Sequence, residues 1–184
     1  MRAAPIALLA ITLLPCLPLY GQQFGKAENL APYIPTPPAM VDRLLKAAHL
    51  KPGDTVYDLG SGDGRILIAA AQQYGARGVG IEINPDLCEK ARAQISRLGL
   101  QDRVTMIHGS ALHADLSHAD VVTMYLLTSS NERLKPNLDR YLKKGARVIS
   151  IEFQIRGWRP AELIEMTVAG TRHVFYVYEM GQHQ

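Results

Sequence analysis

Cysteine is scarce in this sequence, with only Cys16 and Cys88 among 184 residues. The first lies in an apolar N-terminal segment and the second in an expected helix, so we expect no disulfide between them. No pair of cysteine or histidine residues has the spacing of a zinc site, so the sequence predicts no metal. Lysine and arginine are scattered and the net charge is only +3, so nothing argues for nucleic acid as a partner.

The sequence also lacks an apolar run long enough for an uninterrupted membrane-spanning helix. Its most apolar stretch, residues 6–14, follows Arg2 and is soon interrupted by Pro15 and Pro18. A short basic start, an apolar stretch and a small residue near Gly21 are typical of a secretory signal or an uncleaved anchor. We therefore expect residues 1–22 to export the protein or tether it to a membrane. A cytoplasmic protein with a misplaced start is the alternative.

Beyond an expected arm at residues 23–38, the pattern alternates between strand and helix through one domain, residues 39–184. Thr36 is expected to cap a first helix that buries Met40, Leu44 and their neighbours. Strand patterns then cover residues 55–59, 78–83, 104–108, 121–127 and 147–155, and helical patterns cover residues 65–74, 85–98 and 131–142. Two final strands, 162–168 and 173–178, are separated by a short turn, which is typical of a hairpin. This order predicts an α/β, Rossmann-like fold with a mostly parallel sheet that ends in an antiparallel hairpin.

The strongest local signal is a glycine-rich turn with the sequence Asp58-Leu-Gly-Ser-Gly-Asp-Gly-Arg. Glycine permits positive φ and close approach of a ligand to the main chain, and the following helix presents free N–H groups. A dinucleotide-binding turn has its third glycine one residue later, so this spacing favours a ligand without a pyrophosphate. Asp58 is then expected to accept from an amino group of the ligand, directly or through water. A plain turn between strand and helix is the alternative.

Glu82 closes the second expected strand, about twenty residues beyond the turn. An acidic side chain at this place in such folds reaches both ribose hydroxyls of a nucleoside ligand. Alone, Glu82 would be taken for a solvated residue at the end of a strand. Together with the turn, it predicts a ribose-binding role.

The turn, Glu82 and the strand order resemble class I S-adenosylmethionine-dependent methyltransferases, and the resemblance extends over residues 33–180. Tyr33-Ile-Pro-Thr-Pro, the glycine-rich turn, Arg147-Val-Ile-Ser and Trp158-Arg-Pro resemble, more narrowly, one family of protein-lysine methyltransferases. The animal members of that family act on the mitochondrial ATP synthase c subunit and the adenine nucleotide translocase. The resemblance implies S-adenosylmethionine as the cofactor and a sheet of about seven strands with the last antiparallel.

The resemblance also implies which residues bind the cofactor. Tyr33 and Thr36 would lie in an arm over its methionine end, although a turn tyrosine and a helix cap explain them equally well. Ser110 stands where many relatives carry an aspartate for the adenine amino group, so the backbone N–H of Ala111 is expected to take over part of that contact. The full expected set is Tyr33, Thr36, Asp58, Gly60, Ser61, Gly62, Gly64, Glu82, Ile83, Ser110 and Ala111.

Tyr125 is the candidate catalytic residue, because it lies at the carboxyl end of the fourth strand, where ligands gather in open α/β sheets. An aromatic ring there could hold a lysine amine, although a core strand tyrosine is an equal alternative. The surrounding Met124-Tyr-Leu-Leu lacks the Asn-Pro-Pro-Tyr pattern of enzymes that act on nucleobases. His113 and His118 are expected on the surface, and Glu152 is a weaker candidate. A lysine amine becomes neutral by desolvation near a sulfonium, so no dedicated base is expected.

We therefore expect methylation of lysine in a membrane-associated protein. A small-molecule N- or O-methyltransferase is the main alternative, although the chain leaves little room for the added cap that such an enzyme would need. A non-catalytic module that binds S-adenosylmethionine is a further alternative. An NAD-dependent oxidoreductase is disfavoured by the glycine spacing.

Overall fold

The computed structural model describes residues 28–184, so the expectations for residues 1–22, Cys16 among them, lie outside the described range. Its strands are β1 (Thr55–Leu59), β2 (Arg77–Glu82), β3 (Val104–His108), β4 (Val121–Met124), β5 (Arg147–Ile151), β6 (Glu162–Val168) and β7 (Thr171–Glu179). Its helices are α1 (Pro38–Ala47), α2 (Arg65–Tyr74), α3 (Pro85–Arg97) and α4 (Thr128–Tyr141), with a 3-10 turn η2 (Ala111–His113). No helix among these residues is both long and apolar enough to cross a membrane.

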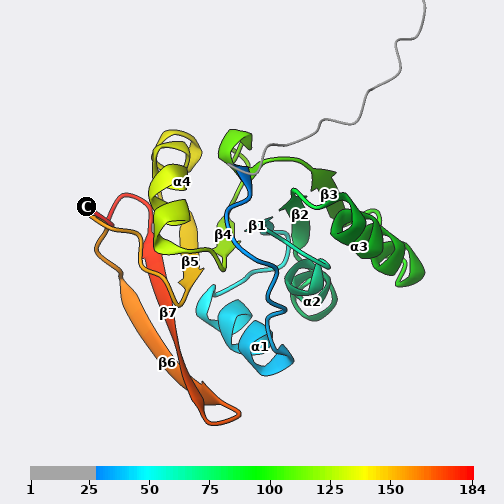
Figure 1. The fold of residues 1–184 in the computed structure, drawn as a ribbon, viewed down its shortest axis with the longest axis horizontal. Coiled ribbons are helices and arrows are strands. Elements are labelled where there is room, and N and C mark those ends of the chain that lie inside the picture. The colour runs from blue at the N-terminus through cyan, green and yellow to red at the C-terminus, as the bar shows by residue number, and fades with distance from the viewer. Residues whose placement is uncertain (1–27) are drawn as a thin grey trace, which may run out of the picture.

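The seven strands form one sheet in the order β3-β2-β1-β4-β5-β7-β6 (Figure 1). The strands from β3 to β5 are parallel, whereas β7 runs antiparallel to both β5 and β6. The expected fold class is thereby confirmed. The order reverses between β1 and β4, and ligands bind in open α/β sheets outside the carboxyl ends of the strands at such a point.

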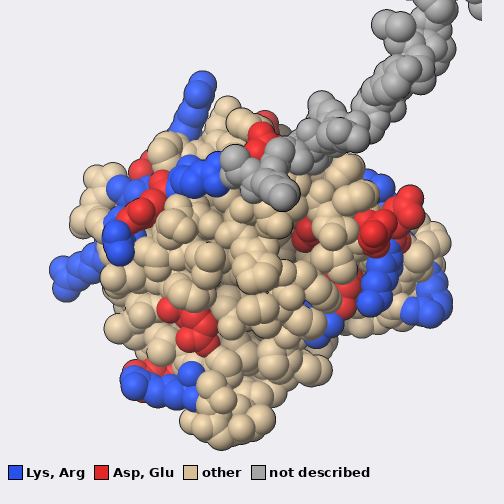
Figure 2. Space-filling view, viewed as in Figure 1, with Lys and Arg blue, Asp and Glu red and all other residues tan. Residues whose placement is uncertain are grey.

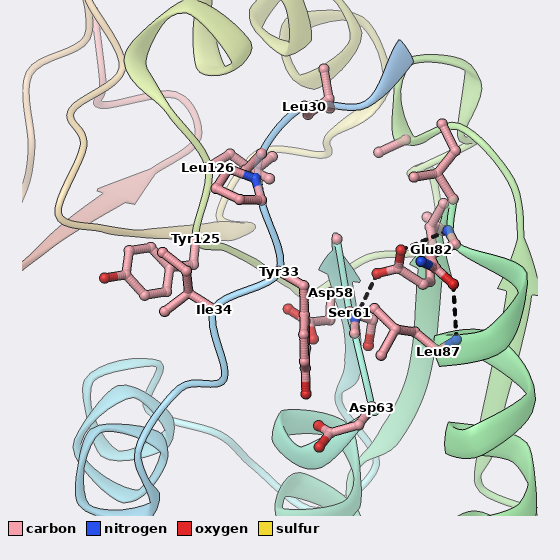
Figure 3. Close-up of a pocket in the computed structure, with 18 of the residues that line it drawn as sticks. Leu30, Tyr33, Ile34, Asp58, Ser61, Asp63, Glu82, Leu87, Tyr125 and Leu126 are labelled. Atoms are coloured by element: carbon pink, nitrogen blue, oxygen red, sulfur yellow. Dashed lines mark hydrogen bonds between the residues drawn. The ribbon is translucent and has the colours of Figure 1, made fainter. Parts of the chain in front are cut away.

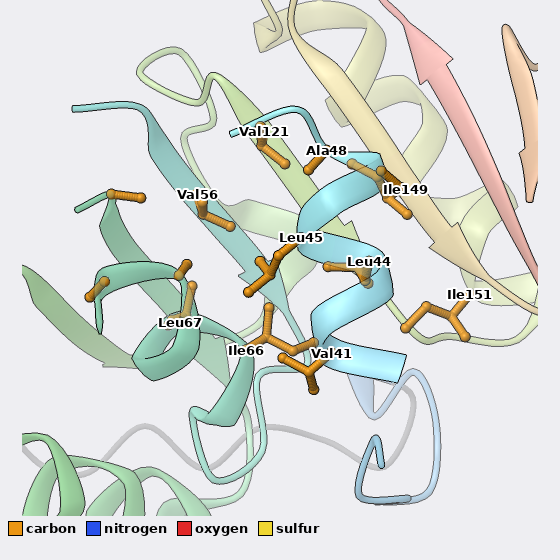
Figure 4. Packing of buried hydrophobic residues seen from close by; sticks show 14 of the residues in the cluster. Val41, Leu44, Leu45, Ala48, Val56, Ile66, Leu67, Val121, Ile149 and Ile151 are labelled. Atoms are coloured by element: carbon orange, nitrogen blue, oxygen red, sulfur yellow. The ribbon is translucent and has the colours of Figure 1, made fainter. Parts of the chain in front are cut away.

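Each face of the sheet is covered by its own core. On one face α1, α2 and α3 pack on the sheet, and α1 buries Leu44 and Leu45 beside Ile149 (Figure 4). The helix face expected from the sequence is therefore confirmed. On the other face α4 contributes Leu134 and Leu138 to a second core, which also contains Trp158 and Tyr178. Burial of large side chains on both faces fixes the strand register, and with it the positions of the strand ends.

Three local expectations were wrong. Thr36 does not cap α1, because the helix begins at Pro38 with Pro37 as its N-cap residue and no side-chain cap. The fourth and fifth strands end at Met124 and Ile151, several residues earlier than expected. After Met124 the chain leaves the sheet, and Tyr125 and Leu126 line a cavity. After Ile151 the next buried apolar residue, Ile155, packs in the second core. Helix α4 starts three residues earlier than expected, at Thr128.

Candidate cofactor and acceptor site

A cavity opens at the carboxyl ends of β1, β2 and β4, where the strand order reverses (Figure 3). The space between its walls amounts to about 930 Å³, part of which is open solvent. Its walls come from the arm, the glycine-rich turn, the end of β2, the segment before η2 and the residues after β4. Of the expected site residues it brings together Tyr33, Thr36, Asp58, Gly60, Ser61, Gly62, Glu82, Ile83, Ala111 and Tyr125.

Glu82 ties the glycine-rich turn to the end of β2. Its Oε2 accepts a hydrogen bond of 2.7 Å from the Gly62 N–H, and its Oε1 accepts one of 2.8 Å from the Asn84 N–H. The side chain is buried, at 6% exposure, and it lines the cavity. Each carboxylate oxygen can accept more than one hydrogen bond, so Glu82 retains acceptor capacity for hydroxyl groups in the cavity.

Gly60 and Gly62 both adopt positive φ, at 78° and 56°. A Cβ atom added to Gly62 would lie 2.5 Å from the ring of Tyr33, and one on Gly60 would lie 3.2 Å from Leu126. Only glycine therefore allows the turn to approach the cavity walls so closely. Gly64 serves a different purpose from the one expected. It lies outside the cavity lining, and its missing side chain lets α2 pack against Ala91 of α3, 3.3 Å from an added Cβ.

Asp58 is a buried carboxylate at the floor of the cavity, only 3% exposed. Its Oδ1 accepts a hydrogen bond of 2.6 Å from the Thr123 hydroxyl on the neighbouring strand β4. Burial raises the pKa of Asp58 to about 6, although the hydrogen bond from Thr123 acts in the opposite direction. The carboxylate is thus mostly ionised at neutral pH, and no cation from residues 28–184 pairs with it. A ligand ammonium group would supply that compensation.

The arm lies across the cavity and is fastened at both ends. Arg65 binds both carboxylate oxygens of Asp63, at 2.8 and 2.6 Å, and donates to the Thr36 carbonyl at 2.9 Å. At the other end the Ser130 hydroxyl of α4 donates to the Leu30 carbonyl. Between these points the ring of Tyr33 extends over the turn towards Asp63 (Figure 3). The arm therefore closes one side of the cavity, with Thr36 acting through its backbone.

Replacing Arg65 with alanine is expected to raise the KM for the cofactor about five- to twentyfold, because the arm loses its fastening near Thr36. A charge-assisted hydrogen bond contributes about 1.5–3 kcal/mol, part of which water would restore because the Arg65 side chain is 35% exposed. Steady-state kinetics at varied cofactor concentration would measure the effect. Arg65→Lys should recover only part of it, since lysine cannot bind Asp63 with two parallel bonds. An unchanged KM would show that the arm contributes nothing to cofactor binding.

The other candidate residues from the sequence lie beside the cavity, in its wall or on the surface. Ser110 is buried and lies beside the cavity, next to Ala111 in the lining, and its hydroxyl has no hydrogen-bond partner within the described chain. Tyr125 directly follows β4 and lines the cavity. His113 and His118 are exposed, as expected from the sequence.

Sequence reasoning missed Thr123, Arg65 and Leu126. Thr123 lies 65 residues from Asp58 in the chain, and only the register between β1 and β4 brings them together. Arg65 was noted only as the residue that ends the glycine pattern. Its spacing of two residues from Asp63 was a usable signal, because both side chains lie at the start of a helix.

The residues of this cavity fit S-adenosylmethionine. Gly62 forms a cradle that a Cβ would fill, Asp58 offers an uncompensated buried charge, and Glu82 offers free acceptor capacity. The buried Ser110 hydroxyl, without a partner among residues 28–184, lies between the lining residues Gly109 and Ala111. Figure 2 shows that the face carrying the arm is mostly uncharged or acidic in its middle, with Lys and Arg nearer its margins. A glycine turn, two carboxylates at strand ends and this sheet define a class I S-adenosylmethionine-dependent methyltransferase.

Comparison with known proteins narrows the class to a family. The family model described as the ANTKMT methyltransferase domain matches residues 58–162. A protein-lysine N-methyltransferase of Saccharolobus islandicus (strain REY15A) is 46% identical over 83% of this chain and 96% of its own. The adenine nucleotide translocase lysine N-methyltransferase of Mus musculus is 33% identical over 72% of this chain, but over only 58% of its own length. The chain belongs to this family of protein-lysine N-methyltransferases.

One similar solved structure carries a different description. The crystal structure of an RNA methyltransferase from Salinibacter ruber, in complex with S-adenosyl-L-homocysteine, is 43% identical and superposes with a TM-score of 0.76. It covers 82% of this chain and 96% of the other. Binding of S-adenosylmethionine or its product is therefore supported, while the descriptions of the relatives differ in substrate.

Proposed function

We propose that this protein-lysine N-methyltransferase acts on a membrane-associated protein, and that the lysine reaches the cofactor past Tyr125. The observation that carries the proposal is an apolar rim around an acidic cavity. Tyr33 and Ile34 of the cavity wall are 44% and 57% exposed, and Leu127, next to the lining residue Leu126, is 43% exposed. Exposed apolar side chains that adjoin one site favour an apolar partner surface.

Four residues are proposed to hold the cofactor. Asp58 accepts from its amino group, Glu82 accepts from its ribose hydroxyls, and Ala111 with Ser110 borders its adenine ring. When bound, S-adenosylmethionine supplies an electrophilic methyl group. The side chains around it act by positioning, which can contribute roughly 7–11 kcal/mol towards such a reaction.

Tyr125 is proposed to border the path of the acceptor amine. A free lysine has a pKa of about 10.4, so its ammonium group must lose a proton before it can react. Leu126, Ile34 and the Tyr125 ring form an apolar wall that disfavours the charged form of a lysine inside the cavity. This wall supports methyl transfer without a dedicated base.

RNA is the second candidate substrate, because of the description given to the similar Salinibacter ruber structure. The charges of the cavity argue against it. Among residues 28–184, its lining contains the carboxylates of Glu28, Asp58, Asp63 and Glu82 but only one cation, Arg65, which is already paired with Asp63. A nucleic acid groove needs cations to neutralise phosphates. The ammonium group of an approaching lysine, in contrast, is attracted by these carboxylates before it reaches the apolar wall.

We also propose that residues 1–22 tether the enzyme to the membrane that holds its substrate. The apolar stretch at residues 6–14 in the sequence supports this proposal. Export with removal of these residues and a cytoplasmic location are the alternatives. Cell fractionation followed by N-terminal sequencing would separate the three cases.

The test of the substrate is transfer of labelled methyl from S-adenosylmethionine, catalysed by the full chain, to membrane and soluble extracts of the source cell. Glu82→Ala is the inactive control. We expect label on a discrete membrane protein band, at lysine after peptide mapping, and no label with the control. Label on RNA would support the second candidate, and label only on small metabolites would refute both macromolecular substrates. Lysine label confined to soluble proteins would refute the membrane association.

A further inference from the structure

Glu152 has an unusual backbone conformation close to the cofactor cavity. Its φ is 65°, in the left-handed region that residues other than glycine rarely adopt. Its N–H donates to the Val174 carbonyl at 2.8 Å, and the following Phe153 carbonyl accepts from Asn131 of α4 at 2.9 Å. Strained residues fixed from several sides in this way cluster at functional sites. Glu152 is therefore a candidate for a role that the fold alone does not explain.

The strained backbone places the Glu152 carboxylate against His173 of β7. The Oε1 atom lies 2.5 Å from His173 Nδ1, and the two side chains are 24% and 17% exposed. Because an ionised carboxylate can only accept, His173 Nδ1 carries the hydrogen and donates it. The second oxygen, Oε2, makes no hydrogen bond with any residue from 28 to 184. The carboxylate is thus oriented on one side and available on the other.

This pair adjoins the cavity through Tyr125. Tyr125 follows β4 and Glu152 follows β5. These strands are parallel neighbours, paired up to Met124 and Ser150, so both residues lie at the carboxyl ends of their strands on the same side of the sheet. Burial raises the pKa of Tyr125, and the charge of the nearby Glu152 raises it further. The Tyr125 hydroxyl points away from Asp58 and Glu82 (Figure 3). Tyr125, a wall residue of the cavity, therefore lies near enough to Glu152 to feel its charge.

We propose that Glu152, oriented by His173, and Tyr125 form a binding site for a primary alkylammonium group, which receives the target lysine before it enters the cavity. A carboxylate with a free oxygen beside an aromatic ring combines the two groups that bind such a cation. The site holds the charged lysine outside the cofactor cavity, whose lining does not include Glu152. This inference rests on the proposed function, since it names how the lysine is recognised. It also disfavours a phosphate-bearing substrate at the same mouth.

The probe is n-butylammonium chloride, a mimic of the lysine side chain, titrated into the ¹⁵N-labelled full chain with S-adenosylhomocysteine present. We expect saturable shifts at the amides of Glu152, Phe153 and His173, and no such shifts with n-butanol. Glu152→Gln should weaken binding about tenfold or more, because it removes the charge and keeps the shape. Glu165→Gln is the matched control on the hairpin that carries His173, where Glu165 pairs with Arg172 on the surface, and it should bind as the wild type does.

Glu152→Gly keeps the test informative if glutamine disturbs the turn, because glycine adopts positive φ without strain. This variant should lose the same affinity while its melting temperature is not lowered. The proposed site would be refuted if Glu152→Gln bound the ammonium probe as tightly as the wild type does. It would also be refuted if n-butanol gave equal amide shifts. Label transfer tests the proposed function separately. Labelled lysine together with a negative titration would refute this site alone, and a positive titration without labelled lysine would refute the protein substrate but leave an amine site.

Discussion

Replacing Glu82 with alanine is expected to raise the dissociation constant for S-adenosylmethionine by about a hundredfold or more. The carboxylate holds two backbone N–H groups, those of Gly62 at 2.7 Å and Asn84 at 2.8 Å. Hydrogen bonds to a charged group contribute about 1.5–3 kcal/mol each, so loss of both would remove at least about 3 kcal/mol of the free energy that orders the turn. The proposed ribose contact would be lost as well. Both losses make the free energy of cofactor binding less favourable.

Glu82→Gln is the matched control for this effect, because one amide oxygen can still accept from either N–H. It should weaken binding about tenfold, since a neutral acceptor forms weaker hydrogen bonds than a carboxylate. Isothermal calorimetry with each variant would measure the two constants, and circular dichroism would verify that the sheet is retained. If the dissociation constant of the Glu82→Ala variant lay within about threefold of the wild-type value, Glu82 would not be part of the cofactor site.

Much of the fold was predictable because its strongest signals are local. The strand at residues 55–59 and the helix at residues 65–74 match the structure, since turn and glycine residues mark their ends. The segments at 121–127 and 147–155 were predicted too long. Apolar residues continue beyond both strand ends, where Leu126 enters a cavity wall and Ile155 enters the second core. A run of apolar residues does not reveal whether it is buried in a strand or in a wall.

The site divides in the same way between local and long-range features. The glycine turn and Glu82 lie within one strand–helix–strand unit, so their spacing alone predicts their meeting. The contacts of Asp58 with Thr123 and of Glu152 with His173 join residues 65 and 21 positions apart. They depend on which strands become neighbours in the sheet, and no spacing in the sequence encodes that. The pKa of Asp58 likewise follows from burial under the arm and sheet.

Replacing Asp58 with asparagine is expected to stabilise the cofactor-free protein while nearly abolishing cofactor binding. The folded-state pKa of about 6 exceeds the ordinary 3.8, so the native state binds the proton more tightly than the unfolded chain does. The free energy of unfolding is therefore highest below the ordinary pKa and falls as the pH rises towards 6. Above that pH the ionised carboxylate costs about 3 kcal/mol, since one pKa unit corresponds to about 1.4 kcal/mol.

Asparagine removes that cost and can still accept the hydrogen bond from Thr123 through its amide oxygen. Urea unfolding should thus show Asp58→Asn to be more stable by up to about 3 kcal/mol at neutral pH, with the difference vanishing in acid.

Calorimetry should show cofactor affinity reduced about a hundredfold at neutral pH, because a neutral amide does not compensate an ammonium group. Wild-type affinity should decline as the pH falls through about 6, where Asp58 takes up its proton. Equal stability of the two proteins at neutral pH would contradict the buried charge, and retained affinity would contradict its contact with the cofactor. Both expected results together would identify Asp58 as a residue whose burial weakens the fold in order to bind a cation.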